Sequence, residues 1–306
     1  MDELVHIVYK SYRGYGNYLW KTITNPFPDH GVNFFYLLIV VSLLVWGLEL
    51  LAPWRKNQKP IRQDFWIDAF YMFFNFFIFN LILFIALSNT TAHLFGKLMG
   101  SIGLPEEHIL NVSHWPQGLQ LLTYFILYDF VQWSVHTLLH RIPFLWNFHK
   151  LHHSVQEMGF SAHLRFHFFE LFVYKPVLFI VLSYLFNFSL EQAFIIHIFA
   201  ITIGHLNHAN LGWDYGPLKY IINNPKMHIW HHAKELPDSH PNGINFGISL
   251  SIWDYIFGTK HIPESGRDIA LGFHKVEEYP SNFFKQQVKP FSKTRKTFEE
   301  IDAEVF

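Results

Sequence analysis

A run of 19 residues without a charged side chain, from Phe70 to Ser88, is the feature that most constrains how this chain folds. About 20 apolar residues in a helix cross the hydrocarbon core of a bilayer. Further apolar runs, each with one or two charged residues, cover 34–51, 119–139, 168–188 and 190–205, the last two joined closely enough to form a helical hairpin. Only 15% of the residues are charged, whereas soluble domains average about 25%. We therefore predict an all-α membrane protein with four to five transmembrane helices, rather than a soluble protein whose core holds these helices.

The distribution of basic residues predicts the orientation. The loop between the first two predicted spans contains Arg55, Lys56, Lys59 and Arg62, whereas the 89–116 loop has Lys97 as its only basic residue. By the positive-inside rule the first loop is cytoplasmic. Counting spans from there places the end of the third span and the segment 208–306 on the cytoplasmic side. The N-terminus lacks the basic start and early apolar run of a signal peptide.

Histidines recur at helical spacing in three boxes. These are HTLLH at 136–140, HKLHH at 149–153 and HIWHH at 228–232, and HLNH at 205–208 precedes the third. On a helix, positions i, i+3 and i+4 lie on one face, so each HxxHH box presents three imidazoles together. Imidazole suits zinc, copper, iron and nickel. Eight or more such ligands exceed one tetrahedral zinc site, and the count predicts two metals in a cytoplasmic helical cap.

Other metal chemistries fit the sequence less well. The chain has no cysteine, so thiolate sites are excluded. Carboxylates are scarce around the boxes, which disfavours a carboxylate-bridged hydrolytic site, and the zinc-protease pattern HExxH is absent. Haem held by two imidazoles would place histidines deep within spans, whereas these lie at span ends. The net charge of −1 gives no basic face for nucleic acid.

The boxes and their surroundings resemble the fatty acid hydroxylase/sterol desaturase superfamily of integral-membrane di-iron oxygenases. Besides the box order, the similarity rests on five segments: FLWNFHKLHHS (144–154), RFHFFE (165–170), HANL (208–211), NPKMHIWHH (224–232) and NFGISLSIWDYIFGT (245–259). Phe168 stands where the family's RxHPxE element has proline. The resemblance covers roughly 119–259. It divides the chain into an N-terminal segment with two spans (1–118), a catalytic domain (119–260) and a cytoplasmic tail (261–306).

The resemblance implies a function and a ligand set. The family's chemistry implies two iron ions, O2 as co-substrate, a lipid taken from the bilayer, and electrons from a separate cytochrome b5-like or ferredoxin/reductase protein. The ligands it implies are His136, His140, His149, His152, His153, His228, His231 and His232, with His208 as a ninth. His205, three residues before His208 on the same helical face, is a candidate tenth ligand or a packing histidine.

Residues beside the boxes have less certain roles. Asp129 lies inside the third span in helical register with His136, and an acid within a span is a functional candidate. We expect it to orient a ligand, to shape the substrate path or to hydrogen-bond to a neighbouring helix. Glu170 follows His167 at i+3 and is a candidate to orient that histidine, or to pair with Lys175. His197 lies alone in an apolar run, which is typical of a packed core histidine.

Several alternatives stay open at the level of sequence. A non-catalytic membrane metalloprotein, a scaffold, or a di-zinc hydrolase or transporter would carry the same histidines. Metal identity separates them, because zinc does not change its oxidation state. The lipid is a sterol, a fatty acyl chain, a carotenoid or an alkylglycerol, and the reaction is hydroxylation, desaturation or ether cleavage.

Overall fold

The computed structural model describes residues 2–27, 33–75 and 85–292, and within them the fold is entirely helical. Regular pairing between extended segments is limited there to two isolated bridges, Ile222 with Leu250 and Ala233 with Leu271. The α-helices are α1 (Asp2–Thr24), α2 (Phe34–Leu51), α3 (Phe65–Phe73), α4 (Ile85–Ser101), α5 (Gln117–Arg141), α6 (Pro143–His153), α7 (Phe168–Leu178), α8 (Leu190–His208), α9 (Pro225–His231), α10 (Ile252–Ile256) and α11 (Phe283–Val288). The all-α prediction is therefore confirmed for these residues.

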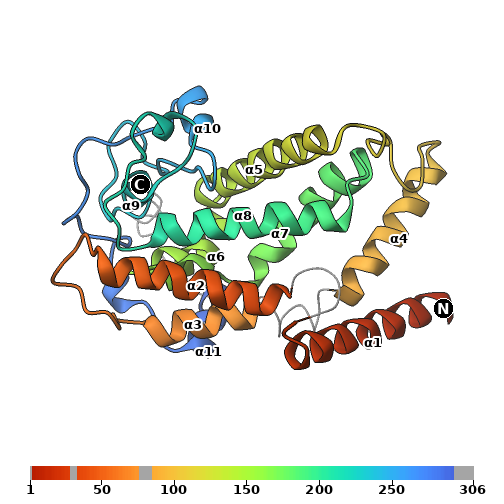
Figure 1. Cartoon of the computed structure of the whole chain (residues 1–306), viewed down its shortest axis with the longest axis horizontal. Helices are drawn as coiled ribbons and strands as arrows, with labels where there is room; N and C mark the ends of the chain where they lie inside the picture. The colour runs from red at the N-terminus through yellow and green to blue at the C-terminus, as the bar shows by residue number, and fades with distance from the viewer. Residues whose placement is uncertain (1, 28–32, 76–84, 293–306) are drawn as a thin grey trace.

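The helices α2, α5 and α8 run along the long axis of the molecule (Figure 1). At one end, the short helices α9 and α10 and their connecting loops form a cap. The α1 and α4 helices pack against each other at the opposite end (Figure 1). The described chain is thus a helical bundle with a cap at one end, and the three histidine boxes all lie at the capped end.

Local sequence signals set the breaks that bring the boxes together. Pro143 occupies the first turn of α6, and Ile142 before it is extended, because a proline disfavours helical backbone in the preceding residue. This break turns the chain between HTLLH and HKLHH. In α9, the Asn224 side chain accepts a hydrogen bond from the Met227 amide and Pro225 follows it in the first turn, a combination that favours helix initiation. The third box therefore starts a new helix.

The helical segments only partly match the predicted spans. Within the described residues, one continuous helical stretch, Phe168–Leu185, is long and apolar enough to cross a membrane; Phe35–Leu51 is apolar but shorter. The longer stretch, Phe168–Leu185, consists of α7, which contains Pro176, and a π-helical continuation, η4 (Phe179–Leu185). The middle of the predicted span at 70–88, residues 76–84, lies outside the described part. The number of four to five spans remains a prediction.

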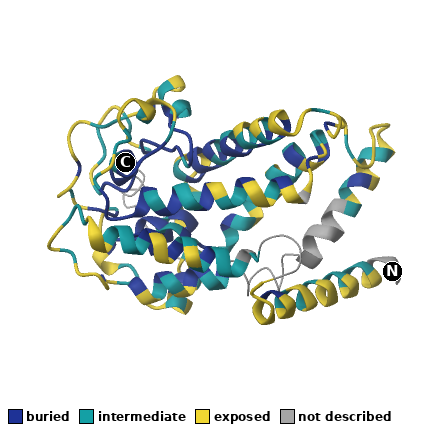
Figure 2. Cartoon of the chain, viewed as in Figure 1, coloured by how far each residue is buried: buried dark blue, intermediate teal, exposed yellow. Residues whose placement is uncertain are grey.

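Buried residues concentrate where α5, α6, α8 and α9 meet, and α1 is mostly exposed (Figure 2). One apolar cluster packs Tyr124 and Tyr128 of α5 against Ile196 of α8. Another lies beneath the cap and includes Ile229 and Trp230 of α9. Ten histidines of the described part are also buried. Burying a polar ring is costly unless it has a partner, so these histidines need an arrangement that satisfies their nitrogens.

Candidate metal centre

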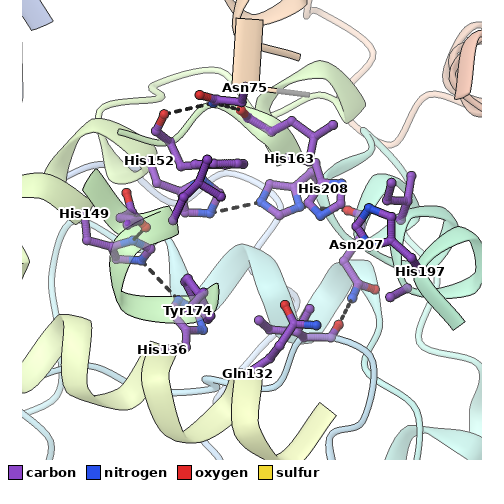
Figure 3. Close-up of a pocket in the computed structure, with 18 of the residues that line it drawn as sticks. Asn75, Gln132, His136, His149, His152, His163, Tyr174, His197, Asn207 and His208 are labelled. Carbon is purple, nitrogen blue, oxygen red and sulfur yellow. Dashed lines mark hydrogen bonds and ion pairs between the residues drawn. The ribbon is translucent and has the colours of Figure 1, made fainter. Parts of the chain in front are cut away.

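Nine histidines form two compact groups at the capped end. Members of each group have one ring nitrogen apiece within 4.8 Å of one another. The first group is His136, His140, His149, His153 and His231, and the second is His152, His208, His228 and His232. Four of these residues, two from each group, are labelled in Figure 3. All nine were predicted ligands, and among the described residues neither group includes a carboxylate.

The two HxxHH boxes divide their histidines between the groups in opposite ways. From the box on α6, His149 and His153 join the first group and His152 joins the second. From the box on α9, His228 and His232 join the second group and His231 joins the first. Residues at i and i+4 are one helical turn apart, whereas i+3 lies on the other side of the same stripe. Each box therefore serves both groups, which requires the groups to be neighbours.

Hydrogen bonds to backbone carbonyls fix the tautomers of four of these histidines. The Nδ1 atoms of His136 and His231 donate to the carbonyls of Phe246 and Ile244, each at 2.8 Å. In the second group, His152 Nδ1 donates to Arg165 at 3.1 Å and His208 Nδ1 donates to Gly204 at 2.8 Å. A carbonyl oxygen only accepts, so each Nδ1 carries the proton. Each Nε2 is left as a lone pair directed into its group.

These lone pairs show that the groups suit metal cations. The Nε2 atoms of His152 and His208 are 3.3 Å apart and those of His208 and His228 are 3.0 Å apart. The Nε2 atoms of His152 and His208 are unprotonated because these two rings carry their proton on Nδ1. In the first group, the buried Nε2 atoms of His140, His153 and His231 have no hydrogen-bond partner within the described chain. Converging lone pairs repel unless a cation lies between them, so neutral imidazoles in this arrangement fit a metal at each group.

Burial keeps the ring nitrogens available for a metal. Removal from water, together with neighbouring imidazoles, lowers the pKa of His153 and His232 well below the usual value for histidine. A histidine ligand must be deprotonated to bind a metal. These rings therefore already have the protonation state that metal binding needs at neutral pH.

Among the described residues, Glu170 is the carboxylate that hydrogen-bonds to a member of the groups. One oxygen accepts a hydrogen bond from His149 Nδ1 at 2.9 Å, and the other accepts from the His167 amide at 3.1 Å, where it caps α7. Glu170 thus orients His149, not the side chain of His167 as its i+3 spacing suggested. The His167 ring instead bonds to the Gln287 carbonyl through Nε2 at 2.9 Å. A carboxylate on the second nitrogen of a ligand histidine fixes its ring and raises its basicity.

A buried ion cluster supports the second group from the outside. Arg165 bonds to Asp64 at 2.8 Å, to Asp68 at 2.9 Å and to Ser154 at 2.8 Å, while its own carbonyl holds His152. Asp68 also pairs with Arg62. The cluster joins the loop before α3 to the residue directly after the second box. Sequence reasoning did not identify this cluster, although Arg165 is the first residue of the RFHFFE segment.

Asp129 and Asp254 both hold the loop that follows the third box. Asp129 accepts from the amides of Ser249 at 2.9 Å and Leu250 at 3.1 Å, and from the Trp253 indole at 2.9 Å. Asp254 accepts from the amides of Phe246 and Gly247. The Asp129 side chain therefore bonds to the backbone of the loop, and the same loop bonds to His136 through the Phe246 carbonyl.

His205 is the predicted ligand that the structure does not bring into either group. Its Nδ1 atom lies 2.8 Å from His163 Nδ1, and its Nε2 atom lies 3.0 Å from Ser42 Oγ. Both ring nitrogens are thus engaged away from the groups. The ring of His163 lies against Gly204, where an added Cβ would be 2.1 Å from its Nε2 atom. His197 hydrogen-bonds to the Tyr128 hydroxyl at 3.2 Å.

A cavity of about 230 Å³ opens beside both groups (Figure 3). Histidines of each group contribute to its wall, among them His136, His149, His152 and His208. Apolar residues of α7 and α8, including Leu171, Leu178 and Ile201, also line it, as do polar residues such as Gln132 and Lys175. A mostly apolar cavity that ends on the grouped histidines is suited to an apolar ligand.

Comparisons with known proteins agree with this site. Residues 121–259 match the fatty acid hydroxylase family. The ornithine lipid hydroxylase OlsE of Rhizobium tropici is 32% identical over 59% of this chain and 53% of its own length. Alkylglycerol monooxygenases of Xenopus tropicalis and Homo sapiens are each 29% identical, over 51% and 53% of this chain and 33% and 35% of their own lengths.

The chain therefore spans about half of the first relative and about a third of the others. No solved structure gives a significant match. The matched segment runs from α5 to just beyond α10 and contains all nine grouped histidines. With its three histidine boxes, this matched segment resembles the fatty acid hydroxylase/sterol desaturase superfamily.

Proposed function

We propose that this chain is an integral-membrane di-iron oxygenase that hydroxylates a C–H bond of a lipid, using O2 and electrons from a separate donor. The observation that carries the proposal is the pair of neighbouring groups formed by nine histidines. Relatives named as a lipid hydroxylase and as monooxygenases favour hydroxylation over desaturation. We assign the catalytic region to 119–260, preceded by an N-terminal segment (1–118) and followed by a tail (261–306).

The residues of the site have distinct tasks in this proposal. The five histidines of the first group would hold one iron and the four of the second group the other. The two irons, when bound, would supply the activation of O2 and the oxidation of the C–H bond. Backbone carbonyls and Glu170 keep the imidazole Nε2 atoms directed inward. The apolar wall formed by Leu171, Leu178 and Ile201 binds the lipid chain and excludes water.

We also propose that the site lies on the cytoplasmic side of a multi-pass protein. The basic loop between the first two predicted spans packs at the same end as the boxes, since Arg55 donates to the Met158 carbonyl at 2.8 Å. The cytoplasmic assignment of that loop by its charges would therefore apply to the metal groups as well. Arg62, one of those charges, is buried in its pair with Asp68, so Arg55, Lys56 and Lys59 carry the argument.

Metal analysis and isotope labelling test the proposal together. Protein expressed with ample iron and purified in lipid nanodiscs should contain about two irons per chain. With reductant and 18O2, a lipid extract should gain one labelled oxygen in a single lipid class, as measured by mass spectrometry. His152→Ala and His231→Ala should each lose metal and labelling, while His114→Ala, at an exposed histidine, should lose neither.

Other outcomes would favour the alternatives. Two tightly held zinc ions despite ample iron would support a di-zinc hydrolase or a scaffold. Iron binding without any labelled lipid would support a non-catalytic metalloprotein. Normal iron content in both box variants would refute the ligand assignment.

A further inference from the structure

Trp146 connects the first histidine group to the surface of the protein. It lies on α6 between the first two boxes and is half-buried. Its ring centroid is 4.9 Å from that of His140 and 5.2 Å from that of His153. Both histidines belong to the first group. An aromatic ring in contact with two metal-binding imidazoles and partly open to solvent gives that group a short connection to the outside.

The connection continues to a second aromatic ring at the surface. The Phe273 centroid lies 6.4 Å from that of Trp146, and the ammonium of Lys150 lies 5.8 Å over the Phe273 ring. Phe273 forms part of the wall of a surface hollow of about 140 Å³. The rings of His140, Trp146 and Phe273 therefore form a continuous series from the first group to this hollow.

Among the described residues, the wall of the hollow carries more positive than negative charge. Lys150, Lys275 and Lys289 contribute to its wall, with Glu278 as its acidic member. Lys275 and Lys289 are exposed. Clustered charge of one sign attracts a partner of the opposite sign and accelerates encounter. The surface thus fits an acidic protein, and the aromatic rings beneath it suit a partner that delivers electrons.

The hollow and the lipid cavity have no wall residue in common. The cavity is lined by residues of α5, α7 and α8 and by His149 and His152 of α6, whereas the hollow is lined by Asn147 and Lys150 of α6 and by the segment 273–292. A protein seated on the hollow would therefore leave the cavity available to lipid. The arrangement separates two reactants, one from the membrane and one from water.

We propose that an acidic one-electron carrier protein docks on the Lys150–Lys275–Lys289 hollow and passes electrons through Phe273 and Trp146 to the first histidine group. This inference rests on the proposed oxygenase function. Hydroxylation of R–H by O2 to give R–OH and water consumes two electrons and two protons, so the carrier docks and is oxidised twice in each turnover. One oxygen atom enters the lipid and the other leaves as water.

Charge reversal tests the docking surface. The probe is a reduced plant-type ferredoxin, mixed anaerobically in a stopped-flow instrument with oxidised, iron-loaded protein in nanodiscs. Lys275→Glu with Lys289→Glu should lower the second-order rate of reduction at low ionic strength at least tenfold, because steering by charge is worth about 10- to 1,000-fold in rate. Reduction by dithionite should be unchanged. The matched control is Lys21→Glu with Lys260→Glu, two exposed lysines outside the hollow, which should keep the wild-type rate.

Substitution of the tryptophan tests the route. Trp146→Leu should retain its iron and the salt dependence of docking but lower the rate at saturating ferredoxin, and Trp146→Phe should restore part of that rate. Equal rates in both lysine pairs, or no reduction of the wild type by ferredoxin at any salt concentration, would overturn the docking proposal while dithionite-driven lipid hydroxylation remained. Wild-type protein without iron would refute the proposed function itself, and this inference with it.

Discussion

Glu170→Gln should weaken metal binding at the first histidine group and leave the second group unchanged. In the wild type, one carboxylate serves two donors, His149 Nδ1–H at 2.9 Å and the His167 amide at 3.1 Å. Glutamine has the same shape but a single acceptor oxygen. If its amide NH2 group faces His149, two donors oppose each other, and the ring must move its proton to Nε2. That is the nitrogen that faces the other ligands.

The size of the effect follows from the bond that is lost. A hydrogen bond to a charged group contributes about 1.5–3 kcal/mol, and loss of a hydrogen-bond partner behind a ligand histidine typically lowers metal affinity about 10- to 100-fold. At about 1.4 kcal/mol per factor of ten, the two ranges agree. We therefore expect metal affinity at the first group to fall about 10- to 100-fold.

Anaerobic Co2+ titration of metal-free protein in nanodiscs, followed by visible absorption, measures the two binding events. A matched control is Glu49→Gln, because the Glu49 carboxylate also accepts from two amides, those of Phe160 and Asn210, and contacts no grouped histidine. The control should bind both metals as the wild type does. Equal weakening of both events in Glu170→Gln, or unchanged affinity at both, would refute the assignment of this carboxylate to the first group.

Three further predictions concern the supports of the site. Gly204→Ala should displace the His163 ring, since the added Cβ would lie 2.1 Å from its Nε2 atom. Overpacking of this kind lowers the free energy of unfolding by about 1–3 kcal/mol. Thermal unfolding measures this loss, and an unchanged melting temperature would contradict the prediction. Asp129→Asn should lower stability by about 2 kcal/mol, because one of the buried amides that the carboxylate bonds loses its acceptor; an unfolding free energy equal to that of the wild type would argue against this role. Metal-free protein should lose stability as the pH falls below about 6.5, because the unfolded state then binds protons that the buried His153 and His232, with their lowered pKa, do not bind in the folded state. Chemical denaturation at pH 5 and pH 7.5 checks this prediction. Equal denaturation midpoints at the two pH values would count against neutral rings at these two histidines.

Much of the site was predictable because its spacing is local. HxxxH and HxxHH on helices place imidazoles on one face whatever the rest of the fold does, and nine of the ten predicted ligands do converge. The tenth, His205, shares a helix with His208. Spacing alone could not separate them, because the difference lies in what faces each ring: His163 and Ser42 in one case, His152 and His228 in the other.

The supporting residues were harder to predict because their partners are distant in sequence. Glu170 is three residues from His167 but 21 from His149, and its carboxylate reaches the side chain of the more distant one. Asp129 has the helical register of a ligand orienter, yet it bonds to a loop 120 residues later. Trp146 was visible only as an aromatic residue near the second box. Its position between the first group and Phe273 depends on how α6 packs against the segment after α9.

The sequence by itself determined that the described chain would be helical, that its histidines would share helical faces in pairs and triplets, and that it resembles the fatty acid hydroxylase/sterol desaturase superfamily. These properties depend on helical periodicity and composition, which act within about two turns. The tertiary structure decided how the boxes divide between two groups, which carboxylate supports which histidine, and where the lipid cavity and the basic hollow lie. Those outcomes depend on helix packing. Residue spacing along one helix sets the directions of its side chains around the helix axis, but it does not set the distance or orientation of the neighbouring helix.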